Sequence, residues 1–250
     1  MLKKLLASVG IGKATVDTIL LVDKLRAGDS FPIEVVIKGG DVEQQINGLE
    51  FAVMASAKAE TEVNDTDITY AKSIVLQHWA QPMDILIQPG ETITESFELD
   101  LHPEVPATYL FGQQIGKVWL QTGLDIKSGI DGSDKDPLII LPSATQLAVL
   151  EFISNSGYRL FKSDIEAGGV QTREFVSHLN CYQEYEFKPE SRSFFGAREL
   201  EVTFVDNGRE TGVLIEVDRA FLGDGYRSTS IPNHCTTPES VKPYIERLLG

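Results

Sequence analysis

The stretch GIDGSDKDPLIILP, from Gly129 to Pro142, combines three aspartates, two glycines and a proline before it turns apolar. It lies just past the middle of a chain of 250 residues, which is long enough for one large domain or two ordinary ones. Gly, Ser and Asp bend and solvate a chain, and proline favours an extended entry into the apolar run that follows. We therefore predict an interdomain linker that includes Asp131, Asp134, Asp136 and Pro137.

The same aspartates raise the alternative of a calcium loop. An EF-hand loop alternates its oxygen ligands ahead of a glycine turn and ends on a glutamate. Here the aspartates are spaced three and two apart, Gly132 precedes the later pair, and Pro137 follows where the chain should wrap around the ion. This spacing favours the linker. A metal- or small-ligand-responsive β-sandwich that uses the Asp131–Asp136 loop stays open as an alternative.

The sequence before the linker alternates between apolar and polar residues with the period of a β-strand. Ile33, Val35 and Ile37 alternate with Glu34 and Lys38, and similar runs follow around Phe97 and Leu120. Turns such as RAGDSFP, KGGD and QPGE separate the runs and supply the backbone conformations that strand connections need. Residues 1–136 are therefore predicted to form a β-sandwich.

The sequence after the linker continues in the same style. Five short runs rich in aliphatic and aromatic residues read as strands: QLAVLEF, YRLFKSDI, CYQEYEF, ELEVTFV and GVLIEVD. The tail then changes to a helical period, for which Ser240 is a candidate N-cap and Pro243 falls in the expected first turn. Residues 137–250 are therefore predicted to form a second β-sandwich with a C-terminal helix.

The N-terminus carries one short amphipathic pattern. Leucines and a valine recur at helical spacing, with Lys3 and Lys4 on the opposite face and Gly10 and Gly12 after it. The pattern predicts a helix that docks on its own protein or on a partner; reversible membrane contact is the weaker alternative, because two lysines add little attraction to anionic lipid. The residues concerned are Leu2, Leu5, Leu6 and Val9.

The composition argues against several classes of partner and site. A net charge of −15 repels nucleic acid, and no run approaches the ~20 apolar residues that span a membrane. Two isolated cysteines suit a reducing cytoplasm, which is the location we expect. The common nucleotide-binding, hydrolase and zinc-protease motifs are absent, so we expect no catalytic residue, metal ligand or cofactor. A sandwich-fold hydrolase with dispersed catalytic residues would leave no short motif and stays a minor alternative.

Several of these runs together resemble a known family. SVGIGKATVDTILL, AGD and VVIKGGDVEQQINGLEF in the first half are similar to the N-terminal domain of the bacterial sporulation-control protein M family. The resemblance continues through VWLQTGLDIKSGIDGSDKDPLIILP and then through QEYEFKP, ELEVTF and EVDR in the same order.

This resemblance implies two arrestin-like β-sandwich domains joined by a short linker, and a regulatory or scaffold role without catalysis. The residues point independently toward a binding protein, because several strand edges are expected and no catalytic constellation is visible. An exposed strand edge offers unpaired N–H and C=O groups to another chain. The expected partners are therefore other proteins, including a second copy of this chain through a strand edge.

Overall fold

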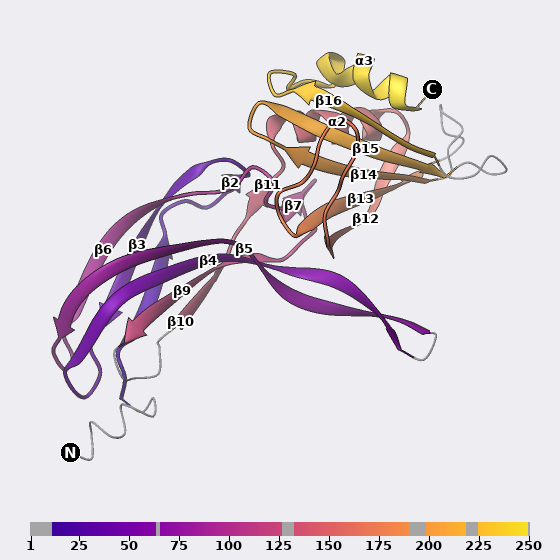
Figure 1. The fold of residues 1–250 in the computed structure, drawn as a ribbon. Coiled ribbons are helices and arrows are strands. Elements are labelled where there is room, and N and C mark those ends of the chain that lie inside the picture. The colour runs from indigo at the N-terminus through magenta and orange to yellow at the C-terminus, as the bar shows by residue number, and fades with distance from the viewer. Residues whose placement is uncertain (1–11, 64–65, 127–132, 191–198, 219–224, 250) are drawn as a thin grey trace.

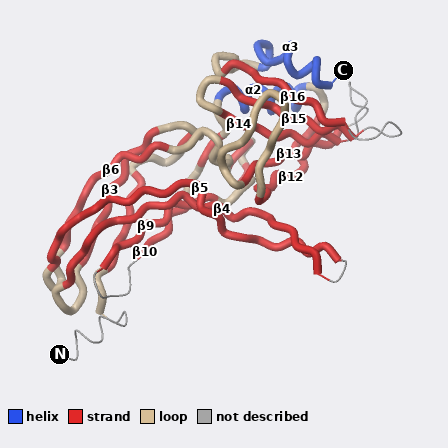
Figure 2. Tube along the Cα trace, viewed as in Figure 1, coloured by secondary structure: helices blue, strands red, loops and turns tan. Residues whose placement is uncertain are grey.

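Strands dominate the structure (Figure 2). The computed structural model describes residues 12–63, 66–126, 133–190, 199–218 and 225–249. Within these ranges the regular elements are strands β1 to β16 and two helices, α2 (Ala144–Asn155) and α3 (Pro238–Leu249). The predicted all-β class is therefore confirmed. The predicted N-terminal helix, with Leu2, Leu5, Leu6 and Val9, lies outside the described residues.

Two sheets hold most of the described strands. The smaller sheet has the order β1 (Thr15–Leu20), β3 (Ser30–Lys38) and β6 (Thr92–Asp100). The larger sheet starts at β10 (Ser133–Pro137) and continues through β9 (Val118–Ile126), β4 (Gln44–Val63), β12 (Tyr158–Ala167), β13 (Cys181–Pro189), β14 (Glu199–Asp206), β15 (Glu210–Asp218) and β16 (Gly225–Pro232). Strand β5 (Thr66–Ile87) pairs with β4 beside this path.

Two short pairings lie near the middle of the molecule. Strand β2 (Leu25–Arg26) runs parallel to β11 (Ile140–Leu141), and β7 (Tyr109–Leu110) pairs with β8 (Gln113–Gln114). The first pairing joins residues on either side of the predicted linker.

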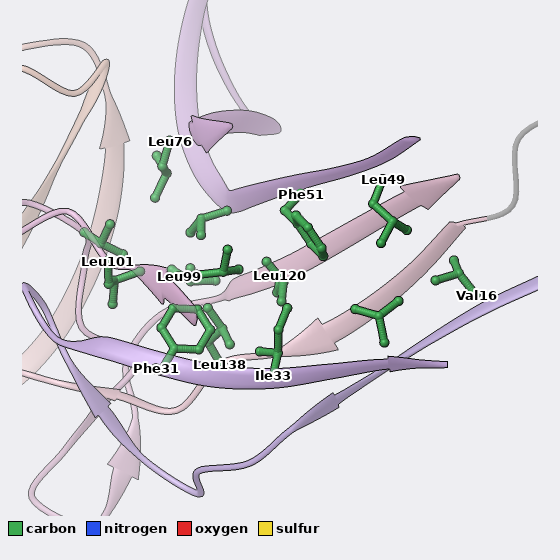
Figure 3. Close-up of a cluster of buried hydrophobic side chains, with 14 of the residues drawn as sticks. Val16, Phe31, Ile33, Leu49, Phe51, Leu76, Leu99, Leu101, Leu120 and Leu138 are labelled. Atoms are coloured by element: carbon green, nitrogen blue, oxygen red, sulfur yellow. The ribbon is translucent and has the colours of Figure 1, made fainter. Parts of the chain in front are cut away.

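The first hydrophobic core lies between the smaller sheet and the β10–β9–β4–β5 part of the larger one (Figure 3). In β3 every second residue from Phe31 to Ile37 is buried, and the inward side chains of β9 and β4 meet them. This is the packing expected of two sheets with alternating apolar faces, so the predicted inward positions in β3 and β9 are confirmed. Leu138, Ile140 and Ile165 also belong to this core, although they lie after the predicted domain boundary.

The second hydrophobic core lies on one face of strands β12 to β16. Helices α2 and α3 pack on this face and on each other, as Figure 1 shows at the C-terminal end of the molecule. Leu200 and Val202 of β14 and Val213 and Ile215 of β15 point into it, as their alternation predicts. The division into domains 1–136 and 137–250 stays a prediction, because the larger sheet is continuous through both cores.

One predicted strand is wrong. QLAVLEF forms most of helix α2, with Val149, Leu150 and Ile153 buried. The helix begins with a capping box, in which the Ser143 hydroxyl accepts from the Gln146 N–H and the Gln146 side chain accepts from the Ser143 N–H. A short apolar run has no decisive period, so the cap was the signal that distinguished a helix from a strand.

The predicted C-terminal helix is confirmed, but its start is three residues earlier than expected, because Thr237 and not Ser240 is the N-cap. Helix α3 begins at Pro238, and the Thr237 hydroxyl accepts from the Ser240 N–H at 3.3 Å while the Ser240 hydroxyl accepts from the Thr237 N–H at 3.1 Å. Thr237 therefore caps the helix and Ser240 completes the pair. Proline is favoured at the first helical position, which Pro238 fills, whereas Pro243 lies in the second turn.

Candidate functional site

The predicted linker residues lie on a paired strand. Asp134, Asp136 and Pro137 belong to β10, which runs antiparallel to β9, with Asp136 opposite Leu120. Asp131 lies outside the described residues. The chain then reaches helix α2 through residues 138–143. Whether this passage acts as a hinge between domains stays a prediction.

Asp134 joins the two sheets that enclose the first hydrophobic core, which we call the first sandwich, at their β1 and β10 side. Its Oδ2 accepts from the Thr18 N–H of β1 at 2.8 Å, and its Oδ1 accepts from the Lys135 N–H at 2.8 Å. Beside it, partial burial and the negative charges of Asp134 and Asp17 raise the pKa of Asp136 to about 6. Asp134 therefore connects β10 to β1 by a hydrogen bond, and Asp136 lies beside that connection.

Gln77 closes the opposite side of the same sandwich. Its side-chain N–H donates to the Asp100 carbonyl at 3.1 Å, and its Oε1 accepts from the His102 N–H at 2.7 Å. This joins β5 to the end of β6. Side chains therefore bridge both open sides of the first sandwich, where backbone pairing stops.

The remaining strand ends of the larger sheet differ in how they are protected. At β10, inward-pointing aspartates and a proline are features that discourage another strand from pairing. At the other end, Arg227 of β16 donates to the Leu248 carbonyl of α3 at 3.0 Å, and Arg247 donates to the Thr229 hydroxyl at 2.9 Å. Helix α3 is thus fastened beside β16.

The far halves of β4 and β5 form a two-stranded arm that extends away from the first core and runs apart from the C-terminal strands (Figure 1). We define the arm as residues 54–63 of β4 and 66–75 of β5, which pair with each other; its outer part, 58–63 with 66–71, lies outside both cores. Lys58 pairs in register with Glu166 of β12, and its ammonium group forms an ion pair with Asp164. Within the described residues, β5 pairs with β4 alone along its whole length. The arm therefore carries an open strand edge.

The open edge of the arm is exposed and rich in residues that favour strands. Three large apolar side chains are close to half exposed or more: Ile68 at 45%, Tyr70 at 44% and Val75 at 55%. Small residues oppose the central part of this segment, since Ala59 faces Tyr70 and Ala57 faces Lys72. Natural proteins usually protect a long edge with proline, charge or a bulge. The first proline of β5 is Pro82, outside the arm.

A bulge marks the inner end of this edge. The register between β4 and β5 shifts between Val53 and Met54, because Gln77 is opposite Val53 and Val75 is opposite Met54. Leu76 is the extra residue, and its side chain is buried in the first core. The bulge therefore separates the inner part of β5, which Gln77 connects to β6, from the arm part, for which the described residues show no such side-chain connection.

A second cluster of interest is a group of carboxylates on the outer face of the C-terminal strands. Glu186, Glu201 and Glu216 are directly opposite one another on β13, β14 and β15, and Glu184 shares a side-chain hydrogen bond with Glu201. Burial and the charges of Glu184 and Glu216 raise the pKa of Glu201 to about 7. The Glu184–Glu201 pair therefore holds a proton at a pH where an ordinary glutamate is ionised.

Lysine side chains neutralise part of the negative charge of this cluster. Oxygen atoms of Glu186, Glu199 and Glu201 lie within 4.8 Å of one another, which is close enough for a cation. Both oxygens of Glu186, however, already face ammonium groups, Lys162 at 2.8 Å and Lys188 at 3.0 Å. A buried carboxylate paired in this way is a structural ion-pair network, and it supplies no argument for a metal. A cleft of about 800 Å³ lies beside it, under the 169–174 segment.

The sequence interpretation missed the arm. A strand edge was expected as an interaction site, but the length of the hairpin and its extension past the cores were not. The usable signal is the segment Ile68–Val75, which has neither glycine nor proline and contains four β-branched residues and one tyrosine. Among the described residues, no helix combines the length and the apolar character needed to cross a membrane.

Comparison with known proteins gives one consistent relationship. The family model described as Spo0M, SpoOM protein, matches residues 2–221. The sporulation-control protein spo0M of Bacillus subtilis (strain 168) is 33% identical over 224 residues, which cover 88% of this chain and 81% of that protein. The crystal structure of Spo0M from Bacillus subtilis superimposes with a TM-score of 0.78 at 26% identity, over 96% of this chain and 98% of the other.

Proposed function

This chain belongs to the Spo0M family, and we propose that it is a non-enzymatic regulatory protein that acts by binding other proteins through the open edge of β5. Membership of a family named for sporulation control supports a regulatory role. We further propose that binding occurs by strand addition, in which an extended segment of another chain pairs with residues 66–75.

The observation that carries this proposal is the contrast between the arm and the other strand edges. The edge of β10 has aspartates and a proline, β16 lies against α3, and the inner part of β5 is bridged to β6 by Gln77. The arm has only Lys72 as a described charged side chain on its β5 edge between residues 68 and 75. It is therefore the edge at which strand addition meets the least obstruction.

The arrangement of the acidic groups supports a non-catalytic role. Asp134 accepts two backbone N–H groups and Glu186 is held by two lysines, so these carboxylates serve to join strands. We also propose a cytoplasmic location, since Cys181 and Cys235 are both buried free thiols.

The proposal is tested by affinity capture with the tagged protein from a lysate of its own cells. The variant Ala71→Glu places a charge in the middle of the arm edge, and Ala80→Glu places the same charge at an exposed position of β5 outside the arm. We expect proteins captured by the wild type to be captured by Ala80→Glu and lost, by about tenfold or more, from Ala71→Glu. Equal recovery by all three baits would contradict a role for the arm.

A further inference from the structure

The open edge of β5 has a sequence that is complementary to itself. The segment Ile68–Ile74 reads ITYAKSI, with an isoleucine at each end, a hydroxyl residue next to each isoleucine, and Ala71 at the centre. Tyr70 and Lys72 flank the centre. An antiparallel pair of identical segments places the first half of one copy against the second half of the other, so this pattern brings matching residues together.

The geometry of an antiparallel ladder limits the possible registers. Two directly opposite residues both point their backbone groups toward the neighbouring strand or both away from it. A two-fold axis between identical strands must therefore pass through a residue, not between two residues. Near the middle of the exposed edge, the candidate centres are Tyr70, Ala71 and Lys72.

Of these centres, Ala71 gives the best pairs. It puts Tyr70 opposite Lys72 of the second copy, where an ammonium group meets an aromatic face, and Ile68 opposite Ile74. A centre at Lys72 would put two ammonium groups directly opposite, and a centre at Tyr70 would put Ile68 opposite Lys72. The register centred on Ala71 is therefore selected by side-chain chemistry.

The placement of the arm makes this pairing sterically available. The outer part of the arm, in which 66–71 pair with 58–63, lies outside both cores (Figure 1). With the two-fold axis at Ala71, Thr66 of each copy is opposite Leu76 of the other, so the outer end of each arm lies beside the bulge of the second copy. Ile68 and Tyr70 are exposed and Ile74 is partly buried against the first core. Pairing over seven residues forms about six to eight backbone hydrogen bonds. Such an interface is small, and interfaces of this size are typical of weak or transient complexes.

Resting on the proposed function of the arm, we propose that its occupant is a second copy of this chain, paired antiparallel through Ile68–Ile74 of β5 about a two-fold axis at Ala71. The dimer is isologous, since the same edge is used on both copies. Each protomer buries the exposed Ile68 and Tyr70 against Ile74 and Lys72 of the other.

The pairing is tested by charge complementation at the two-fold axis. In Ala71→Glu and in Ala71→Lys, like charges are directly opposite, so sedimentation velocity should show the dimer dissociation constant of each raised by about tenfold or more. An equimolar mixture of the two variants should recover dimers at the wild-type level or better. Ala80→Glu and Ala80→Lys are the controls, and both should dimerise like the wild type. Within its own chain Ala80 is opposite Glu50 and Ala71 is opposite Lys58, so the pair of controls includes one like-charge neighbour, as the pair of test variants does.

Single cysteines test the register. Ala71→Cys should form a disulfide-linked dimer on mild oxidation, whereas Thr69→Cys and Ser73→Cys alone should not, because each would be displaced from its own copy by four residues, about 13 Å along the strand. A mixture of Thr69→Cys and Ser73→Cys should cross-link. The native thiols are buried and do not compete.

The outcomes separate this inference from the proposed function. A wild type that is monomeric up to about 200 μM, or a mixture of Ala71→Glu and Ala71→Lys that stays monomeric, overturns the dimer. If Ala71→Glu then still loses captured proteins, strand addition stands with a different chain as the occupant. If Ala71→Glu dimerises and captures proteins like the wild type, both the dimer and the role of the arm are overturned.

Discussion

At the scale of single residues, the Glu184–Glu201 pair is the clearest source of pH-dependent stability. Because the folded state raises the pKa of Glu201 to about 7, it holds a proton that the unfolded chain has already lost. The free energy of unfolding therefore falls as the pH rises through the interval from about 4.5 to about 7, and the loss is complete above it. This stabilisation is present at low pH and absent at high pH.

The variant Glu201→Gln tests whether the free energy of unfolding falls as the pH rises. Its amide keeps a hydrogen bond to Glu184 and cannot ionise, so we expect it to be about 1 kcal/mol more stable than the wild type at pH 8 and nearly equal at pH 5. Urea denaturation at both pH values measures the difference. Glu98→Gln, at an exposed position of β6, is the control and should change little. A variant that is less stable than the wild type at pH 8 would contradict a shared proton.

The predicted linker aspartates show what spacing can and cannot reveal about a residue. Their order in the sequence argued against an EF-hand loop, but it contained no sign that Asp134 accepts from the Thr18 N–H, 116 positions earlier in the chain. That contact depends on β1 and β10 lying at the same side of the sandwich. Such a role depends on the order of the strands in the sheets. The alternation of apolar residues predicts strands but does not predict their order.

At the scale of elements, the first sandwich depends on Gln77 to hold β5 to the end of β6. Replacing it with alanine removes two hydrogen bonds and leaves the part-buried His102 N–H without its partner. We expect Gln77→Ala to lower the free energy of unfolding by about 1–3 kcal/mol, measured by urea denaturation. Gln81→Ala, four positions along the same strand and exposed, is the matched control. Equal stability of the two variants would show that Gln77 does not bridge the sheets.

Elements were predictable where their period was clear. The alternation in β3, β9, β14 and β15 identified strands and their buried faces, because one side of each must face a core. QLAVLEF had no such alternation, and the capping box that starts the helix pairs the first residue of this run, Gln146, with Ser143, which lies just outside the run. The hairpin of β4 and β5 was missed because its outer half has no core against which to alternate.

At the scale of the whole molecule, one continuous sheet connects the two hydrophobic cores. Strand β4 is the link, since it pairs with β9 in the first core and reaches β12 at Lys58. Composition predicted enough buried surface for two cores, and the apolar runs predicted their location. The continuity of the sheet could not be predicted, because no local pattern specifies a single bridge between Lys58 and Glu166.

The central claim is that the edge of β5 in the arm pairs with another chain. Backbone hydrogen exchange reports this directly, because amides that enter a ladder become protected. Exchange measured by mass spectrometry on concentrated and on dilute wild-type protein should show protection of residues 66–75 that increases with concentration. The same segment in Ala71→Glu should exchange fast at both concentrations, while Ala80→Glu should follow the wild type. Protection of this segment that is unchanged by concentration and by Ala71→Glu would contradict the pairing.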